Sequence, residues 1–572
     1  MKQLPLALLS LLLLGAIFAQ VPQAMAASPL IDFNGDGYAD LAVGVPTEDV
    51  NGQANAGLVN VIYGSAAGLS ATTVPDQRFF QDYSAGTPGS NIRDTSEAND
   101  LFGAALAAAD FNGDGYSDLA AGVPEEDLGG VADAGAVNVI YGSSAGLSPD
   151  AVIANQVWSQ GSADVEDSIE QGDRFGSSLA AADFDGDGYF DLAIGVPDES
   201  INGRPSAGSV NILYGSAGGL SPASDQRFFQ DTAGIADFSE DNDRYGSSLA
   251  GGDPDGDGHG DLVVGARGED IGPVADAGAL SVIYGSPSGL SASNVLPDQL
   301  WTGTSPGLDD TLPPACPTPI SGIGHPGALA TGDFNGDGYD DAGFGAATHF
   351  PGEGSGGPCG HAFYGARGIL FVIYGSPSGL AITASRPDQV GREDSIADFA
   401  RTVSAGDFNN DGNDDLVTSF AAFFSVAPGD LTGGGLGNVY VYHGSPAGLP
   451  ESTFPSSAGL LEPSQGWSQG EADDDVEDRA ETQDHFGYAV ATDDFNGDAY
   501  ADIAVGVPGE DLSPHANPYE DLHENQGAVN TIYGSAPGLS ATAVLQDQFW
   551  MQDTSSIEDA AESGDQFGGV LG

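Results

Sequence analysis

The sequence predicts an all-β fold, a seven-bladed β-propeller whose blades are four-stranded antiparallel sheets. Three observations predict it. The string D-x-[DN]-x-D-x-x-x-D occurs seven times at spacings of 70 to 87 residues, and a second string close to VIYGSxxGLS also occurs seven times. A period of tens of residues is typical of propellers, and this one has room for four short strands. Finally, 86 Gly and 34 Pro accompany 40% apolar residues, which indicates many turns around a packed core.

The third repeat shows how the strands are assigned. FGSSLAAAD from Phe175 is expected as a strand of small residues, DFDGDGYFD from Asp183 as a loop, and LAIGVP from Leu192 as a short buried strand. GSVNILYG from Gly208 alternates as the third strand, and DQRFFQD from Asp225 forms the fourth. Four antiparallel strands make one blade.

The two ends of the chain predict how the ring closes. After its first residues the chain enters an aspartate-rich loop with no Phe-Gly strand before it, and residues 565–572, DQFGGVLG, supply such a strand with no loop after it. Joined, the two segments complete one repeat. We therefore expect the N- and C-terminal segments to pair and to remove the exposed sheet edges of an open ring.

The first 26 residues are typical of a secretory signal peptide. Lys2 provides a positive start, an apolar run extends to Phe18, and Ala24-Met25-Ala26 offers a cleavage site between small residues. The run is shorter than the roughly 20 apolar residues of a membrane span. We expect cleavage near Ala26, one propeller in residues 27–572, and a soluble monomer that is extracellular or periplasmic.

The charge balance excludes one class of partner. The chain has 13 Lys+Arg against 84 Asp+Glu and a formal net charge of −71, which argues against nucleic acid. Acidic segments such as TEDV from Thr47, EEDL from Glu125 and DVEDSIEQGD from Asp164 are expected on the face opposite the aspartate-rich loops. Two interpretations remain open: a solvated rim, or a surface for a basic or cation-bridged partner.

The seven aspartate-rich loops have the pattern of a shortened calcium loop. In the first, residues 32–40, the expected ligands are side chains at positions one, three, five and nine and the backbone carbonyl at position seven, with Gly37 at position six for the sharp turn. Carboxylate-rich oxygen coordination favours Ca²⁺, up to seven ions in all. The predicted ligands are Asp32, Asn34, Asp36, Tyr38 and Asp40; Asp110, Asn112, Asp114, Tyr116 and Asp118; Asp183, Asp185, Asp187, Tyr189 and Asp191; Asp253, Asp255, Asp257, His259 and Asp261; Asp333, Asn335, Asp337, Tyr339 and Asp341; Asp407, Asn409, Asp411, Asn413 and Asp415; Asp494, Asn496, Asp498, Tyr500 and Asp502. The corresponding loops are 32–40, 110–118, 183–191, 253–261, 333–341, 407–415 and 494–502.

One loop departs from the pattern. Ala499 stands at position six, where the other loops have glycine, and a Cβ there is unfavourable if the backbone needs a positive φ. We therefore expect the seventh site to be the weakest. For all seven, the main expectation is that calcium stabilises the turn between two strands and does not itself contact a ligand.

Together, Phe-Gly, an aspartate-rich loop and Gly-Val-Pro resemble the FG-GAP repeat of the seven-bladed propeller in integrin α subunits. The resemblance recurs along nearly the whole mature chain. It implies ligand recognition on the face opposite the calcium loops, where the second-to-third and fourth-to-first connections lie. Units four to six depart from it, with Tyr245-Gly246, Pro326-Gly327 and Phe399-Ala400 in place of Phe-Gly, and these blades are expected to be the most irregular.

Other candidate residues lie in the fifth and sixth units. Cys316 and Cys359 fall in connections on the same rim and are expected to form a disulfide outside the cytoplasm; zinc held with His349 or His361 is the alternative. The sixth unit carries Phe420, Phe423 and Phe424, which are either core residues or, if exposed, a candidate contact patch.

Three functions follow in order of preference. The first is an adhesion or interaction module for an extracellular protein; the second is a lectin-like propeller that holds glycans with Trp158, Trp301, Trp467 and Trp550. The third is a hydrolase or polysaccharide lyase. Residues 142–146 match G-x-S-x-G, but the equivalent turn in the first unit has Ala66 in place of the serine, so no catalytic residue is assigned.

Overall fold

The computed structural model describes most of the chain as strands and turns. It contains 29 strands and no helix in the described part, and so no helix there that could span a membrane. The described residues are 30–72, 74–82, 91–149, 153–272, 274–293, 296–306, 308, 329–349, 366–382, 389–392, 399–420, 437–451, 461–469, 476, 484–511, 525–542, 545–552, 554, 557, 562 and 564–572.

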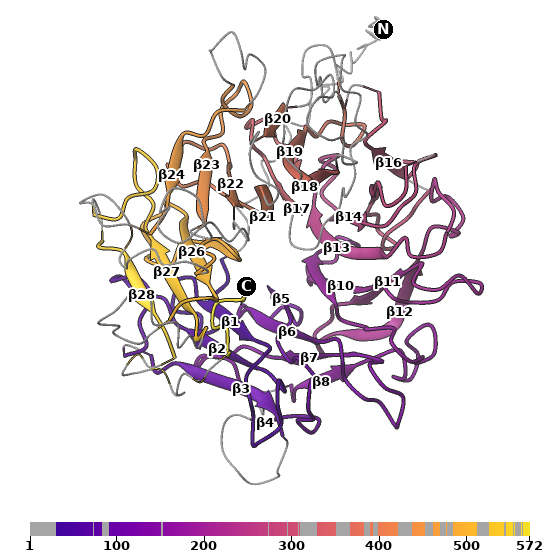
Figure 1. The fold of residues 1–572 in the computed structure, drawn as a ribbon, viewed down its shortest axis with the longest axis horizontal. Coiled ribbons are helices and arrows are strands. Elements are labelled where there is room, and N and C mark those ends of the chain that lie inside the picture. Colours follow the sequence, from indigo (N-terminus) through magenta and orange to yellow (C-terminus); the bar gives the residue numbers. More distant parts are fainter. Residues whose placement is uncertain are drawn as a thin grey trace, which may run out of the picture.

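Seven sheets stand around a central axis, and this confirms the predicted seven-bladed propeller (Figure 1). In each blade the first strand lies near the centre and the fourth at the periphery. The blades are β29 (Val570–Leu571), β1 (Leu41–Val45), β2 (Leu58–Ile62) and β3 (Gln77–Gln81); β5 (Ala105–Ala109), β6 (Asp118–Val123), β7 (Ala136–Ile140) and β8 (Gln156–Trp158); β9 (Ser178–Ala182), β10 (Asp191–Val196), β11 (Ser209–Tyr214) and β12 (Ser221–Phe228); β13 (Tyr245–Gly252), β14 (Asp261–Ala266), β15 (Ala279–Ile283) and β16 (Gln299–Thr302); β17 (Leu329–Gly332), β18 (Asp341–His349), β19 (Ala366–Ile373) and β20 (Gln389–Arg392); β21 (Phe399–Gly406), β22 (Asp415–Phe420), β23 (Asn438–Tyr442) and β24 (Gln465–Trp467); β25 (Val490–Asp493), β26 (Asp502–Val507), β27 (Ala528–Ile532) and β28 (Gln548–Trp550).

The third blade shows where the predicted strands differ from the observed ones. β10 is buried along its whole length and pairs with β9 and β11 in an antiparallel sheet, as its apolar run predicts. β9, however, begins at Ser178 and not at Phe175. Gly176 has φ +92°, and the Phe175 amide donates to the Ala134 carbonyl of the preceding blade at 3.1 Å. The Phe-Gly pair therefore turns the chain between blades before the strand starts.

Some blades depart from the regular four-stranded pattern at single strands. The first blade gains a short fifth strand, β4 (Asn91–Ile92), which pairs with β3 in parallel. In β13 and β21, where Tyr-Gly and Phe-Ala replace Phe-Gly, the strand begins at the aromatic residue and the register shifts near its start. The first strands of the fourth and sixth units are therefore irregular, but a register shift between β11 and β12 of the third blade shows that irregularity is not confined to units four to six.

The ring closes through the two ends of the propeller, as predicted. β29 pairs with β1 through Val43↔Leu571 and Gly44↔Val570. The Ala42 amide donates to the Gly572 carbonyl at 2.8 Å, and the Gly572 amide donates back at 3.0 Å. The last residues therefore form the innermost strand of the first blade, close to the axis (Figure 1).

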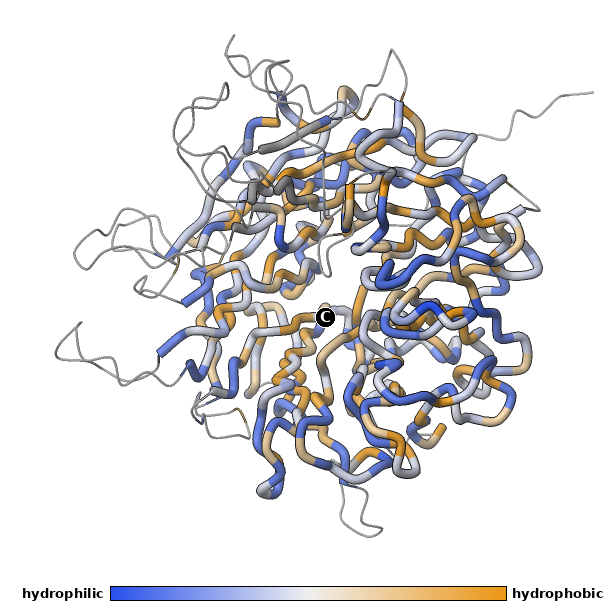
Figure 2. The backbone as a smooth tube through the Cα atoms, turned by 45° about the vertical axis from the view of Figure 1, so that its right-hand side comes forward, coloured by the Kyte–Doolittle hydropathy of each residue, from blue (hydrophilic) through white to orange (hydrophobic). Residues whose placement is uncertain are grey.

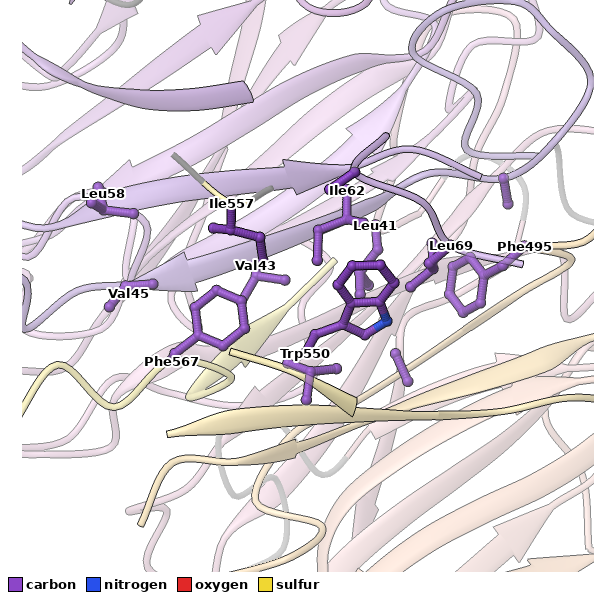
Figure 3. Packing of buried hydrophobic residues seen from close by; sticks show 14 of the residues in the cluster. Leu41, Val43, Val45, Leu58, Ile62, Leu69, Phe495, Trp550, Ile557 and Phe567 are labelled. Carbon is purple, nitrogen blue, oxygen red and sulfur yellow. The ribbon is translucent and has the colours of Figure 1, made fainter. Parts of the chain in front are cut away.

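The hydrophobic core is divided among the seven junctions between blades. Each of seven clusters of buried residues joins one blade to the next. Figure 3 shows the cluster between the seventh and first blades, where Trp550 and Phe567 lie against Leu41 and Val43. Along the chain, hydrophobic stretches alternate with hydrophilic ones, many of which lie in loops (Figure 2). Stability therefore depends on every blade meeting both neighbours.

A hydrogen-bonded latch also joins successive blades. The Tyr141 hydroxyl donates to Gln156 Oε1 at 2.5 Å and accepts from the Leu220 amide of the next blade at 3.0 Å, while Gln156 Nε2 donates to the Leu220 carbonyl at 3.1 Å. A Cβ on Gly219 would lie 2.0 Å from this hydroxyl, which explains the second glycine in GSxxGLS. Each of four more tyrosines bonds a glutamine of its own blade and the next blade's turn: Tyr63, Tyr214, Tyr374 and Tyr533.

Candidate metal centres

Each aspartate-rich loop is folded by its own carboxylates. In the first loop, Asp32 Oδ1 accepts from the Gly35 amide at 2.6 Å and Asp32 Oδ2 from the Gly37 amide at 2.8 Å. The position-nine carboxylate, Asp40, accepts from the Phe33 amide at 2.8 Å and from the Gly64 amide at 2.9 Å. These bonds turn the loop back on itself and bring positions one and nine together.

In the third and fourth loops, where position three is an aspartate, the predicted carboxylate ligands lie close together. One carboxylate oxygen from each of positions one, three and nine lies within 4.8 Å of the others in both: Asp183, Asp185 and Asp191, and Asp253, Asp255 and Asp261. In four of the loops with asparagine at position three, the amide nitrogen instead lies 3.1 to 3.4 Å from the position-nine carboxylate: Asn112, Asn335, Asn409 and Asn496. In six of the seven loops, then, the side chains at positions three and nine lie close together.

The position-nine aspartates are buried, and in six of the loops no basic side chain of the described part of the chain pairs with them. Burial and the neighbouring carboxylates raise their pKa, to about 8 for Asp40, Asp118 and Asp191 and to about 9 for Asp502. No described residue donates a hydrogen bond to the buried Oδ2 atoms of Asp261 and Asp502. Oxygen atoms arranged in this way fit a hard cation such as Ca²⁺, whose charge would compensate the desolvated carboxylates.

The loops also bond to one another around the ring. The Ser117 amide donates to the Asp32 carbonyl of the preceding loop at 2.9 Å, and the Ala39 amide donates to the Asp494 carbonyl at 3.0 Å, which closes the series. The position-two carbonyl reaches the next blade as well, where Phe33 O accepts from the Ser143 amide at 3.1 Å. An ion in one loop would therefore stabilise two blades, and not only the turn between two strands as the sequence analysis expected.

The sixth loop differs from the others through a contact that the sequence did not predict. His443, which replaces the latch tyrosine, places Nδ1 2.9 Å from Asp415 Oδ2. The hydrogen bond to this carboxylate raises the pKa of His443. A histidine at the tyrosine position was visible in the sequence, but its contact with a predicted ligand was not.

The seventh loop has the strain that its sequence predicts. Ala499 has φ +72°, and the glycines at the same position have φ between +85° and +92°. We expect Ala499→Gly to raise the free energy of unfolding by about 1 kcal/mol, because glycine adopts this backbone without the steric cost of a Cβ. Denaturant unfolding in saturating calcium measures it.

The matched control for this change is Gly37→Ala in the first loop. A Cβ on Gly37 would meet no atom within 4 Å, so only the backbone conformation opposes it. We expect it to lower the free energy of unfolding by about 1 kcal/mol. If Ala499→Gly were neutral while Gly37→Ala destabilised, the strain assigned to Ala499 would be wrong.

The acidic connections on the opposite face are partly buried, which corrects the view of a fully solvated rim. The glutamate of each of five second-to-third connections is no more than 5% exposed. Each accepts from a glutamine side chain of the preceding blade; Gln81 Nε2, for example, lies 2.7 Å from Glu126 Oε2. The five are Glu48, Glu126, Glu199, Glu269 and Glu510.

The aromatic candidates take different roles. Trp158, Trp301, Trp467 and Trp550 pack against the clusters between blades, so they contribute to the core. Phe238, which the sequence analysis did not single out, is 76% exposed in a fourth-to-first connection. Its exposure depends on the loop conformation and had no signal in the repeat pattern.

Several predicted residues lie outside the part that the structure describes. These are the signal peptide at residues 1–26, Cys316, Cys359, His361, Phe423 and Phe424. Phe420 ends β22 and His349 ends β18, and the side chains of both are outside the description. The disulfide and the aromatic patch stay predictions.

The G-x-S-x-G match is a structural turn. Ser143 Oγ donates to the Gly146 carbonyl at 2.7 Å, and Ser65 and Ser216 make the same bond to Gly68 and Gly219 in turns that lack the motif's central serine. The match therefore arises from the repeat and does not indicate a nucleophile.

Comparison with known proteins agrees with this architecture. The family model described as the FG-GAP repeat matches residues 25–62, 102–140, 175–213, 245–283, 399–442 and 486–529. Phosphatidylinositol-glycan-specific phospholipase D of Rattus norvegicus is 33% identical over 200 residues, 34% of this chain and 21% of that protein. Integrin alpha-5 of Xenopus laevis is 31% identical over 246 residues, 42% of this chain and 19% of the integrin. The aligned part thus spans about a fifth of the length of either relative.

Similarity to solved structures is weaker. A rhamnogalacturonan lyase of Bacillus licheniformis aligns over 92% of this chain and 74% of its own, with 12% sequence identity and a TM-score of 0.32. At that score the alignment carries no argument about activity.

Proposed function

Because this chain is an FG-GAP repeat protein with seven propeller blades, we propose that it is a secreted, calcium-stabilised module that binds an extracellular protein. The observation that carries the proposal is the closed ring of acidic loops, in which each loop bonds to the next. Calcium in the loops would hold one face of the ring rigid. The opposite face, built from the second-to-third and fourth-to-first connections, is then free to carry recognition.

The proposed binding face has features suited to a protein ligand. Phe238 is a large apolar side chain exposed to solvent between Asp237 and the acidic residues that follow it. An aromatic residue surrounded by charge is a common anchor in protein interfaces. The similarity to integrin alpha-5 supports a binding role of this kind.

The positions of the four tryptophans disfavour the glycan alternative. A lectin of the kind considered above would present tryptophan faces to a sugar, whereas Trp550 is buried between blades and the other three, which are half-buried, pack against the same kind of cluster. The enzyme alternative has its support in the similarity to a phospholipase D, over 21% of that protein's length. Its one sequence motif, at residues 142–146, is a repeat turn.

The proposal can be tested with an array of extracellular matrix proteins and glycans. The array is probed with the purified protein in calcium and again with chelator. We expect calcium-dependent binding to protein spots. Phe238→Ala should weaken binding to the protein spots at least tenfold. Ser144→Ala changes an exposed residue on the face of the calcium loops and should leave that binding unchanged. Binding to glycans alone, or equal binding by both variants, would contradict the proposed function.

A further inference from the structure

Three of the chain's few basic residues gather at one place on the face opposite the calcium loops. Arg174 and Arg244 come directly before the Phe-Gly and Tyr-Gly pairs of the third and fourth blades, where the chain enters the innermost strands β9 and β13. Arg267 follows β14, and because Ala266 pairs with Tyr245 across the sheet, Arg267 lies at the same end of the blade as Arg244. In a chain with 13 Lys+Arg against 84 Asp+Glu, this is a local concentration of positive charge.

Two carboxylates hold two of these arginines in place. Arg174 bridges two blades, since its Nη2 lies 3.1 Å from Glu125 Oε1 of the second blade and its Nη1 lies 3.3 Å from Asp198 Oδ2 of the third. Arg244 Nε donates to the other oxygen of Asp198, also at 3.3 Å. The side chains of Arg174 and Arg244 are 44% and 37% exposed. The pair is therefore ordered by Asp198 and still open to solvent.

Arg267 has no such partner. No carboxylate oxygen of the described residues lies within 4.0 Å of its guanidinium, and its Nε is buried without a hydrogen-bond acceptor. Burial lowers the pKa of Arg267, and the positive charge of Arg244 lowers it further, against the smaller opposing effect of Asp198. Three guanidinium groups thus share two carboxylates. The remaining positive charge is half-buried, and an anion would compensate it.

The internal repeat shows which group is missing at this place. Asp198 directly precedes the buried glutamate of the third blade and binds the arginine of the same blade, Arg174. The residue at that position in the fourth blade is Gly268, and a Cβ on it would lie 2.0 Å from the Asn242 carbonyl oxygen. Among the described residues, Arg244 therefore pairs with a carboxylate of the preceding blade and with none of its own.

Arg267 adds a second donor where the carboxylate is missing. It stands in place of the proline that follows the second strand in four other blades, at Pro46, Pro124, Pro197 and Pro508. The fourth blade has thus lost one carboxylate and gained one guanidinium relative to the third. A carboxylate from another molecule would restore the pairing, because its two oxygens can accept from two guanidinium groups as the oxygens of Asp198 do.

We infer that Arg244 and Arg267 bind the carboxylate of an aspartate or glutamate side chain of the protein partner. The inference rests on the proposed function and specifies the chemistry that the binding face recognises. Phe238 lies in the connection that ends at Arg244, so one segment offers both an apolar and an ionic contact. Glu240 and Asp241 are exposed in the same connection and would repel a polymer with many negative charges, which disfavours a sulfated glycan.

Acetate titration of the full protein tests the site without a protein partner. NMR of protein with isotope-labelled arginine, in saturating calcium, follows the Nε–H groups while sodium acetate replaces sodium chloride at constant ionic strength. We expect the signals of Arg244 and Arg267 to shift saturably, because these donors gain a carboxylate. The signal of Arg204, an exposed arginine of the connection between β10 and β11 on the same face, should not shift. Absence of a saturable shift at Arg267, or tighter binding of sulfate than of acetate, would overturn the inference.

Variants connect this site to the proposed function. On the array of matrix proteins, Arg267→Gln and Arg244→Gln should each weaken calcium-dependent binding by about tenfold or more, since each removes a charged hydrogen bond to the partner's carboxylate. In Arg244→Gln, Asp198 keeps its pairing with Arg174, so the junction of the blades stays joined. Arg204→Gln is the matched control: it removes one positive charge from the same face away from the site and should bind like the wild type.

Failure of the inference and failure of the proposed function give different results. If Phe238→Ala weakens binding to the protein spots while Arg267→Gln does not, the carboxylate site is wrong and the proposed function stands. If no protein spot binds, the proposed function fails and the acetate titration alone decides the site.

Thermal unfolding separates ligand binding from a structural role of Arg267. Arg267→Gln should leave the Tm of the calcium-bound protein unchanged or raise it, because the substitution removes an unpaired, half-buried charge. A lower Tm in this variant would mean that the guanidinium stabilises the fold through its own contacts, and that result would overturn the inference.

Discussion

Deletion of residues 565–572 is expected to lower the free energy of unfolding by about 5 to 10 kcal/mol. Phe567 is fully buried in the cluster between the seventh and first blades (Figure 3), and loss of such a side chain alone costs about 3 to 5 kcal/mol. The deletion also removes the backbone bonds of Gly572 with Ala42 and leaves β1 as an open edge. We expect both a lower denaturant midpoint and concentration-dependent aggregation, because an unpaired edge strand can pair with another chain.

Point substitutions separate closure from the mere loss of terminal residues. Phe567→Ala should cost about 3 to 5 kcal/mol, whereas Gln566→Ala, at an exposed neighbour, should change stability by about 0.5 kcal/mol or less. The comparison uses urea unfolding followed by tryptophan fluorescence, with calcium present throughout. An unchanged midpoint in the deletion variant would show that the ring does not depend on this closure.

The fold was predictable from the sequence because each repeat forms the same structural unit, one blade. The loop from Asp183 and the turn after Tyr214 recur at matching places in every unit, so their period reports the number of blades directly. Closure was predictable for the same reason, since residues 565–572 contain the one strand that the first unit lacks. In both cases the information is local and repeated.

Contacts between repeats were harder to predict. Nothing in EEDL indicates that Glu126 is buried while Glu125 remains at the surface; that depends on Gln81, 45 residues away in the preceding blade. The glutamine that completes the tyrosine latch is likewise 15 residues from Tyr141. Both glutamines recur in the sequence, but a repeated polar residue in a strand does not reveal its partner. The same limit applies to His443, whose contact with Asp415 sets the sixth loop apart.

Removal of calcium is expected to have the largest effect on the intact chain. An ion that binds only the folded protein adds about 2.7 kcal/mol per site when its free concentration is 100 times the Kd. With up to seven loop sites, we expect chelation to lower the Tm by about 10 °C or more. The physical reason is that buried carboxylates such as Asp261 and Asp502 lose the charge that compensates them and repel their neighbours.

Two comparisons test the origin of that effect. Magnesium at the same concentration should restore much less stability, because it requires a tight octahedral shell that these nine-residue loops do not suit. Asp261→Asn retains an acceptor for the Gly285 amide, 2.8 Å away, but removes one charge from a loop with four aspartates, so it should reduce the calcium-dependent gain in Tm. Because loops of neighbouring blades hydrogen-bond to each other, the loss should extend beyond the fourth blade and lower the single cooperative transition of the whole ring. A Tm that chelator changes by no more than about 2 °C would mean that protons, and not calcium, neutralise these carboxylates.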